Sequence, residues 1–187
     1  PERLDDYVGV YRVAERANER RVVTRSAQGL RMQRTGGSLN ALRPIGPDLF
    51  EVGDAGTTAR FRRDSAGRVV GIEVDSGLGP VFRSPRTDES LPAERQVASI
   101  DPATFDTLVG VYVLAPGFDL TVTREGDRLF AQATGQERLE MLPESADRFF
   151  FREVDAQIEF VRSETANTAT SLVFHQGSEN LTAPRKP

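Results

Sequence analysis

Cysteine and tryptophan are absent from this 187-residue chain, and histidine occurs only once, as His175. Without cysteine the chain cannot form a disulfide, present a thiolate nucleophile or bind zinc through sulfur. One histidine does not supply the several imidazoles that a sulfur-free zinc site usually needs. The lack of cysteine fits either the cytosol or the periplasm, so it does not fix the compartment.

Long apolar runs are absent as well. No segment approaches the roughly 20 apolar residues of a membrane-spanning helix, so no membrane span is predicted. No signal-peptide pattern is present, and we expect the start at Pro1 to reflect a trimmed or mature form.

The charge balance is acidic, with a formal net charge of −4 and a pI of about 5.2. Residues 1–85 contain 14 arginines and 11 acidic residues, a net of +3, whereas residues 86–187 contain 10 basic and 17 acidic residues, a net of −7. Attraction between two such halves is weak at exposed sites and is screened by salt. The arginines are scattered and form no basic stripe with aromatic residues, so neither nucleic-acid nor phosphate binding is predicted.

One pattern occurs twice in the chain. Residues 7–11 read Tyr-Val-Gly-Val-Tyr and residues 108–112 read Leu-Val-Gly-Val-Tyr. The matches that follow keep an offset of 99 from residue 24 to residue 61. They include the pairs Thr24 and Thr123, Leu30 and Leu129, Pro44 and Pro143, Asp48 and Asp147, Phe50 and Phe149, and Phe61 and Phe160. The repeat predicts a first domain at 1–85, a linker at 86–100 and a second domain at 101–187.

Both copies have the pattern of short strands. Phe118, Leu120 and Val122 alternate with polar residues, which is a period of two. Residues 125–127, Glu-Gly-Asp, have the composition of a hairpin turn. Such runs and turns recur every 8 to 12 residues or so, which is typical of a sandwich or an up-and-down barrel. In the first copy we expect strands near 7–14, 20–27, 29–35, 38–44, 49–53, 57–63, 68–75 and 79–83.

Each copy has a short helical lead-in before its first strand and a glycine inside that strand. Asp101 and Pro102 suit the cap and first turn of a short helical lead-in, and residues 1–6 are the counterpart. Gly9 and Gly110 interrupt β-branched runs, which indicates a bulge, a bend or a close approach of backbone. We expect both glycines at barrel corners, with the tyrosines two residues later packing nearby.

The second copy resembles a known accessory domain. Residues 108–124, Leu-Val-Gly-Val-Tyr-Val-Leu-Ala-Pro-Gly-Phe-Asp-Leu-Thr-Val-Thr-Arg, resemble its start, and residues 126–132, 147–150 and 174–177 resemble its later segments in order. It is the small DUF3471-like β domain that follows the catalytic domain in secreted serine hydrolases of the β-lactamase and penicillin-binding-protein group. The resemblance covers residues 102–186 directly and residues 1–85 through the internal repeat.

This resemblance implies an all-β fold of two tandem lipocalin-like antiparallel β-barrels, each with about eight short strands. It also implies a bacterial, periplasmic or secreted setting. The chain departs from the family because no hydrolase domain is present. Serine hydrolases of that group use a Ser-x-x-Lys motif. The only lysine here, Lys186, lies in the tail and is not part of one.

No catalytic residue, metal ligand or cofactor is predicted. His175 has Ser171 and Ser178 near it in sequence, but no Gly-x-Ser-x-Gly elbow is present, and we interpret it as an edge histidine bonded to backbone. No calcium-loop pattern occurs. The acidic residues of the second copy are interpreted as solvated outer faces of strands; they include Glu137, Glu140, Glu144, Glu153, Asp155 and Glu159.

The remaining candidates are apolar. An eight-stranded barrel is just wide enough to be filled by side chains or to hold one small ligand. If the second barrel is open, its ligand-binding residues would be Leu120, Val122, Phe149, Phe151, Phe160 and Phe174.

Three functions follow from these observations. The leading hypothesis is a non-catalytic exported module that binds or regulates a partner, such as a serine hydrolase domain or a cell-wall component. The alternative is a lipocalin-like carrier of a small apolar ligand. A hydrolase is the third, and it lacks an identifiable nucleophile with a base. The oligomeric state stays open.

Overall fold

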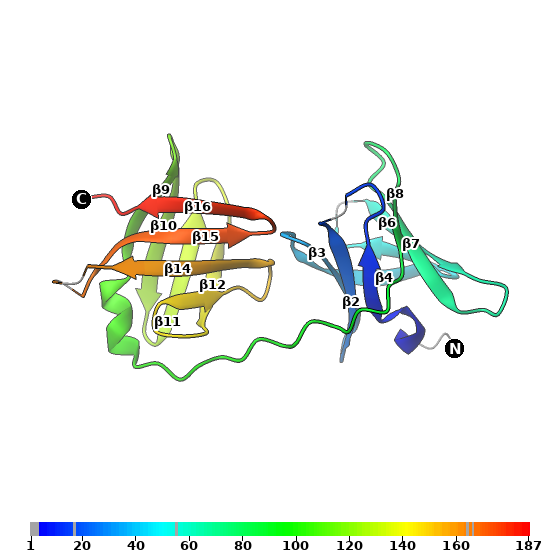
Figure 1. Ribbon diagram of the computed structural model, residues 1–187, viewed down its shortest axis with the longest axis horizontal. Coiled ribbons are helices and arrows are strands. Elements are labelled where there is room, and N and C mark those ends of the chain that lie inside the picture. The colour runs from blue at the N-terminus through cyan, green and yellow to red at the C-terminus, as the bar shows by residue number, and fades with distance from the viewer. Residues whose placement is uncertain (1–3, 17, 55, 164, 166) are drawn as a thin grey trace. The chain divides into compact units, whose positions relative to one another are not determined.

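The computed structural model describes residues 4–16, 18–54, 56–163, 165 and 167–187. The chain divides into two compact units, Pro1–Ala93 and Glu94–Pro187. Each unit holds one eight-stranded antiparallel sheet in which every strand pairs with its neighbours in sequence (Figure 1). The expected all-β fold of two tandem barrels, each built from its own strands, is therefore confirmed.

The first unit begins with a 3-10 turn, η1 (Leu4–Tyr7). Its strands are β1 (Gly9–Arg12), β2 (Arg20–Ser26), β3 (Gly29–Arg34), β4 (Leu39–Gly46), β5 (Leu49–Val52), β6 (Thr57–Arg63), β7 (Val69–Asp75) and β8 (Phe82–Pro85). These bounds lie within a few residues of those expected from the period-two pattern, because glycine and Asx turns separate the strands in sequence.

The second unit begins with η2 (Pro102–Thr107), where Asp101 caps the turn by accepting a hydrogen bond from the backbone N–H of Ala103 at 2.9 Å. The predicted cap is therefore confirmed. The strands are β9 (Gly110–Ala115), β10 (Phe118–Glu125), β11 (Arg128–Ala133), β12 (Arg138–Pro143), β13 (Arg148–Phe150), β14 (Ala156–Arg162), β15 (Ala169–Gln176) and β16 (Glu179–Pro184).

Each sheet curls until its first and last strands meet. In the first unit a β-bridge joins Tyr11 to Arg86, and the N–H of Thr87 donates to the carbonyl of Val10 at 2.9 Å. In the second unit a bridge joins Tyr112 to Arg185, and Figure 1 shows β16 beside β9. Closure leaves few unpaired strand edges, which are the usual sites of aggregation in β proteins.

Alternate residues of the strands point inward and fill each barrel. The first core is built from buried residues that include Val23, Leu30, Met32, Phe50, Phe61 and Ile72. The second includes Leu120, Val122, Leu129, Met141, Phe149, Ile158 and Leu172. Each contains the repeated tyrosine of its first strand, since Tyr11 and Tyr112 are both fully buried. Their hydroxyls donate to the carbonyls of Tyr7 at 2.6 Å and Leu108 at 2.7 Å.

Successive turns of an up-and-down meander lie at opposite ends of the barrel. In the first unit, η1 and the turns β2–β3, β4–β5 and β6–β7 form one end, which we call the helix end. The turns β1–β2, β3–β4, β5–β6 and β7–β8 form the other end, the far end. Tyr7 closes the helix end from inside, because its side chain is fully buried against Phe50 and Phe61.

The segment expected to be a linker, residues 86–100, makes contacts with both units. Arg86 and Thr87 bridge to the first barrel, and Glu89 forms ion pairs with Arg12 and Arg20. Further along, the N–H of Ala98 donates to the carbonyl of Pro143 at 2.8 Å in the second barrel. None of the helices in the described part of the chain is long and apolar enough to cross a bilayer.

Candidate functional site

The internal repeat supplies a control for identifying a site. A side-chain arrangement that both barrels share serves the common fold, whereas one that a single barrel has is free to serve a separate function. Strand register shows which residues of the two barrels occupy equivalent positions.

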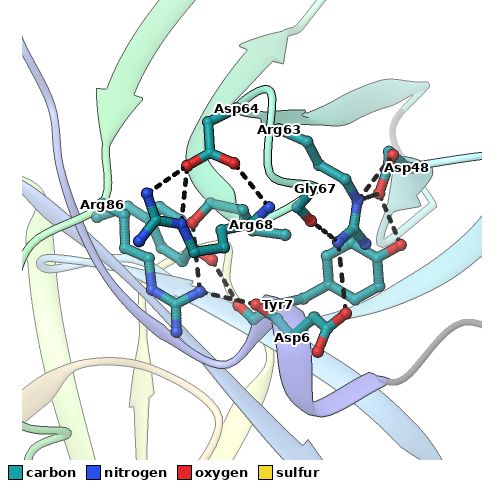
Figure 2. A network of polar contacts seen from close by, with 10 residues as sticks. Asp6, Tyr7, Asp48, Arg63, Asp64, Gly67, Arg68 and Arg86 are labelled. Atoms are coloured by element: carbon teal, nitrogen blue, oxygen red, sulfur yellow. Dashed lines mark hydrogen bonds and ion pairs between the residues drawn. The ribbon is translucent and has the colours of Figure 1, made fainter.

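A polar network at the helix end of the first barrel surrounds Arg63 (Figure 2). Its Nε donates to Asp48 at 2.9 Å, and its Nη1 donates to the carbonyl of Gly67 at 2.7 Å and to Asp6 at 3.4 Å. The hydroxyl of Tyr7 donates to the same Asp48 carboxylate at 2.8 Å. Burial disfavours the charge of Arg63, but hydrogen bonds with Tyr7 and Asp48 and the Asp48 charge outweigh it and raise its pKa.

The second barrel has a matching arginine–aspartate network around Arg162, with Thr107 and Leu108 at the positions of Asp6 and Tyr7. This arginine pairs with Asp147, donates to the carbonyl of Asn167 at 3.0 Å and donates to Thr107 at 2.5 Å. Asn167 has a φ of 50°, in the left-handed region that Gly67 also adopts with a φ of 77°. Because the two barrels share this network, we assign it to the fold: it ties the 3-10 turn to the strand turns at the helix end.

An arginine at the last strand of each barrel forms a second shared feature. The guanidinium of Arg86 lies over Gly9 and donates to the carbonyls of Asp6 at 2.7 Å and Val8 at 2.6 Å. Arg185 lies over Gly110 in the same way and donates to the carbonyl of Val109. Each glycine leaves room for an arginine that holds the barrel seam closed, a reason that the sequence pattern did not show.

His175 lies on β15 close to the β15–β16 turn. Its Nδ1 is 2.6 Å from the side-chain oxygen of Asn180, and its Nε2 is 3.8 Å from Glu159. The histidine therefore bonds to a side chain and not to backbone as expected. Glu159 itself accepts a hydrogen bond from Arg148 at 2.7 Å. The described contacts of His175 include no serine hydroxyl, so no nucleophile is placed beside this imidazole.

Several acidic residues of the second barrel pair with arginines at the surface. Glu140 pairs with Arg128 at 2.6 Å and Glu144 pairs with Arg95 at 3.1 Å. The Arg128 hydrogen bond lowers the pKa of Glu140, which keeps this carboxylate ionised. Among the residues that the structure describes, no group of three or more candidate ligands could hold a metal ion.

The six apolar candidates lie in the packed interior of the second barrel. Leu120, Val122, Phe149, Phe151 and Phe160 are buried, and Phe174 packs partly buried against them. A ligand site on these residues stays a prediction, and a ligand would have to displace this packing. None of the six lines the pocket described next or the shallow hollow of about 720 Å³ beside Gly110 and Arg185.

The first barrel has a pocket of about 180 Å³ at its far end. We call it the arginine pocket, and its lining includes Arg16, Glu19, Arg21, Arg34, Val74 and Phe82. Arg21 points inward from β2 and is only 5% exposed, and it donates to the hydroxyl of Ser84 at 2.7 Å. Arg16 and Arg34 hold Glu19 between them at the mouth, at 2.9 and 3.1 Å.

The charge of Arg21 is poorly compensated. No ion pair within 4.0 Å joins it to a carboxylate of the described residues, and its described hydrogen bond is to a neutral hydroxyl. Burial and the like charge of Arg34 lower the pKa of Arg21, while the charges of Glu19 and Glu15 act in the opposite direction and only partly offset the effect. The ring of Phe82, 5.9 Å from the guanidinium, gives a further modest compensation. A buried cation in such surroundings is costly to the fold.

The second barrel lacks this pocket chemistry. In the strand ladders of the first barrel, Arg21 lies opposite Tyr11 and Arg34. Its equivalent in the second barrel is Leu120, which lies opposite Tyr112 and Ala133. By the same matching, Ser84 corresponds to Ala183, and Val74 corresponds to the larger Phe174. The far end of the second barrel is thus filled by leucine, alanine and phenylalanine. In the first barrel the equivalent residues are arginine, serine and valine, which leave this end polar and hollow. The arginine pocket is therefore the candidate site.

Sequence reasoning missed this site for a specific reason. Along the chain the arginines look scattered. Pairing of β2 with β3 sets Arg21 opposite Arg34, and only barrel closure brings these arginines beside β7 and β8. One signal was present: in the alternation of β2, Arg21 occupies an inward position where the second copy has a leucine. A charged residue at a core position of a repeat is a mark of separate function.

Comparison with known proteins finds a family that is similar to the second unit. Residues 94–183 match the model of the family described as "Domain of unknown function (DUF3471)". The chain is also 35% identical over 99 residues to "Penicillin-binding protein 4*" of Bacillus subtilis (strain 168), an alignment that covers 53% of this chain. The resemblance expected from the sequence is therefore confirmed. The alignment spans 22% of that relative's length, so most of the relative has no counterpart here.

Proposed function

We propose that this chain is the non-catalytic accessory part of an exported bacterial serine hydrolase and acts by binding, either to the hydrolase domain or to a cell-wall component. The observation that carries the proposal is the match between the second unit and a DUF3471 domain, together with 35% identity to a bacterial penicillin-binding protein. The same relationship supports a periplasmic or secreted location as part of this proposal.

The contacts of the chain's few reactive groups support a non-catalytic role. His175 bonds to Asn180 at 2.6 Å and has no serine among its described partners. Lys186 pairs with Asp119 at 2.7 Å on the surface and is half exposed, so it is not placed to activate a nucleophile. Function then resides in surfaces and pockets of the barrels.

The alternative, a carrier of a small apolar ligand, has less support. The interior of the second barrel is filled by aromatic and aliphatic side chains. The pocket of the first barrel is lined by three arginines and one glutamate, which favours an anionic over a purely apolar ligand.

Two measurements test the accessory role. The first is a screen of the purified chain with chromogenic esters, D-amino-acid amides and glycosides, run beside His175→Ala. We expect no turnover by either protein, because no nucleophile lies beside a general base among the residues that the structure describes. Turnover that disappears in His175→Ala would make the chain an enzyme and overturn the proposal.

The second measurement is binding. The chain is mixed with a penicillin-binding-protein-type catalytic domain, and in parallel with purified cell-wall material. We expect saturable binding to one of them. Binding to neither, with no change in the hydrolase's kinetic constants, would contradict an accessory function.

A further inference from the structure

The arginine pocket has an unusual combination of features: a buried cation, an excess of positive charge and an apolar wall. Its lining residues include three arginines against one glutamate. The ionised guanidinium of Arg21 cannot escape the cost of burial by losing its proton, since arginine stays charged at all physiological pH values. An anion in the pocket would offset the part of this cost that Ser84 and the nearby glutamates leave uncompensated.

The geometry restricts the kind of anion. Arg21 sits at the inner side of the pocket, and Arg16 and Arg34 stand at the mouth, where Glu19 already engages both. An anion that enters would therefore meet the Arg21 guanidinium, whose N–H groups not used by Ser84 can donate to the oxygens of a carboxylate. The like charge of Glu19 at the entrance disfavours ligands with several negative charges.

The opposite wall is apolar. Val74 and Phe82 face each other across β7 and β8, and the Phe82 ring also lies 4.9 Å from the Arg16 guanidinium. A volume of about 180 Å³ is below the range of roughly 300–1,000 Å³ that holds drug-sized ligands. The pocket therefore fits a small acid with an apolar substituent, or one terminal residue of a longer chain.

We propose that the arginine pocket binds the carboxylate of a small organic acid or of a peptide terminus, with Arg21 as the cation that the carboxylate neutralises. Ser84 orients the guanidinium, and Phe82 and Val74 contact the apolar group next to the carboxylate. The proposal goes beyond the accessory role, since it concerns the first barrel, whereas the family match lies in the second. Either can fail while the other stands.

The test is a binding titration of the full chain by calorimetry, with chemical-shift mapping. Phenylacetate serves as the free small acid and N-acetyl-alanyl-alanine as the chain terminus, each beside its amide, and inorganic phosphate is the third anion. We expect the acids to bind, their amides to bind much more weakly, and the shifts to fall on β2, β7 and β8. The better of the two acids identifies the source of the carboxylate.

Variants that copy the second barrel provide the controls. Arg21→Leu combined with Ser84→Ala reproduces Leu120 and Ala183, so it is expected to fold, which circular dichroism checks. It should weaken acid binding roughly ten- to a hundredfold, the affinity equivalent of a lost hydrogen bond to a charged group. Arg60→Ala removes an exposed arginine outside the pocket and should leave binding unchanged.

Several outcomes would overturn the proposal. These are absence of saturable binding by either acid, equal affinity for acid and amide, tighter binding of phosphate than of both acids, or undiminished binding in the double variant. If the double variant does not fold, Arg34→Ala takes its place, because it alters only the exposed mouth and copies Ala133. It removes one positive charge from the mouth and leaves Glu19 paired with Arg16 alone, so it should weaken acid binding. An unchanged affinity would count against the site.

Discussion

The Nε of Arg185 lies 2.5 Å from the position that a Cβ on Gly110 would occupy. The backbone of Gly110 does not have the positive φ that would itself demand glycine. Glycine is therefore needed at position 110 because the Arg185 side chain lies over it. This position, expected at a barrel corner, lies where the first and last strands of the barrel meet.

Gly110→Val should consequently destabilise the protein by about 1–3 kcal/mol, because the new side chain displaces Arg185 from the carbonyl of Val109. Lys186→Ala, which removes an exposed ion pair with Asp119, should cost less than about 1 kcal/mol. Urea unfolding measures both. Adding Arg185→Ala to Gly110→Val should cause little further loss, since the two changes remove the same contact. Fully additive losses would show that the glycine and the arginine act independently.

Asp48 combines a charge with a left-handed backbone, with a φ of 52°. Asp48→Ala should cost about 2–3 kcal/mol, because it removes the acceptor shared by Tyr7 and Arg63 and places alanine in a strained conformation. Asp48→Asn should cost less, since asparagine tolerates this conformation and keeps one acceptor oxygen. Asp54→Ala is the matched control, as its ion pair with Arg43 is fully exposed on the Asp54 side. Equal thermal midpoints for all three variants would refute the role of the network.

The two buried tyrosines predict how stability falls at high pH. Burial raises the pKa of Tyr11 and of Tyr112 to about 12, above the ordinary value of 10. The stability that each contributes is present below pH 10 and is lost as pH rises toward 12, because the unfolded chain releases the phenolic protons first. The loss amounts to roughly 3 kcal/mol per tyrosine at most.

Tyr112→Phe separates this effect from the hydrogen bond of the hydroxyl to Leu108. At pH 7 the variant should be less stable by about 1 kcal/mol. Between pH 10 and 12 its stability should fall less steeply than that of the parent chain, which is checked by urea unfolding across the pH range. Parallel pH profiles for the two proteins would contradict the assigned cause.

The fold was predictable from the sequence because its signals are local. The turn at residues 125–127 ends β10 at Glu125 and begins β11 at Arg128, and Gly126 takes the positive φ of 59° that such turns favour. The internal repeat then predicted the same strands and turns for the first copy. Barrel closure through Arg86 and Arg185 joins the two ends of a domain, and no local pattern specifies which residue lies over Gly9 or Gly110.

The candidate site was not predictable for the same physical reason. Its members come from three separate stretches of the chain, and each of them has an ordinary local explanation as a surface charge or a strand residue. The apolar residues chosen from the sequence, such as Leu120 and Phe174, do occupy the matching end of the other barrel. There they complete the packing, whereas Arg21 and Val74 leave the first barrel open.

The last prediction concerns how much stability the first barrel loses by burying Arg21 and its partner Ser84. Ser84→Ala alone should destabilise the first barrel by about 1–3 kcal/mol, because Arg21 loses its hydroxyl partner while staying buried. Adding Arg21→Leu should reverse the sign and leave the double variant more stable than the parent by about 1–4 kcal/mol, as happens when buried charges give way to well-packed apolar residues. In the opposite experiment, Leu120→Arg should destabilise the second barrel, where Ala183 offers no acceptor side chain. Denaturant unfolding of these variants gives the energies directly.

A double variant less stable than Ser84→Ala would show that Arg21 stabilises the barrel, and the reason for keeping a buried cation there would be structural. A gain in stability would mean that the chain retains Arg21 at a cost, which is the behaviour expected of a residue kept for binding.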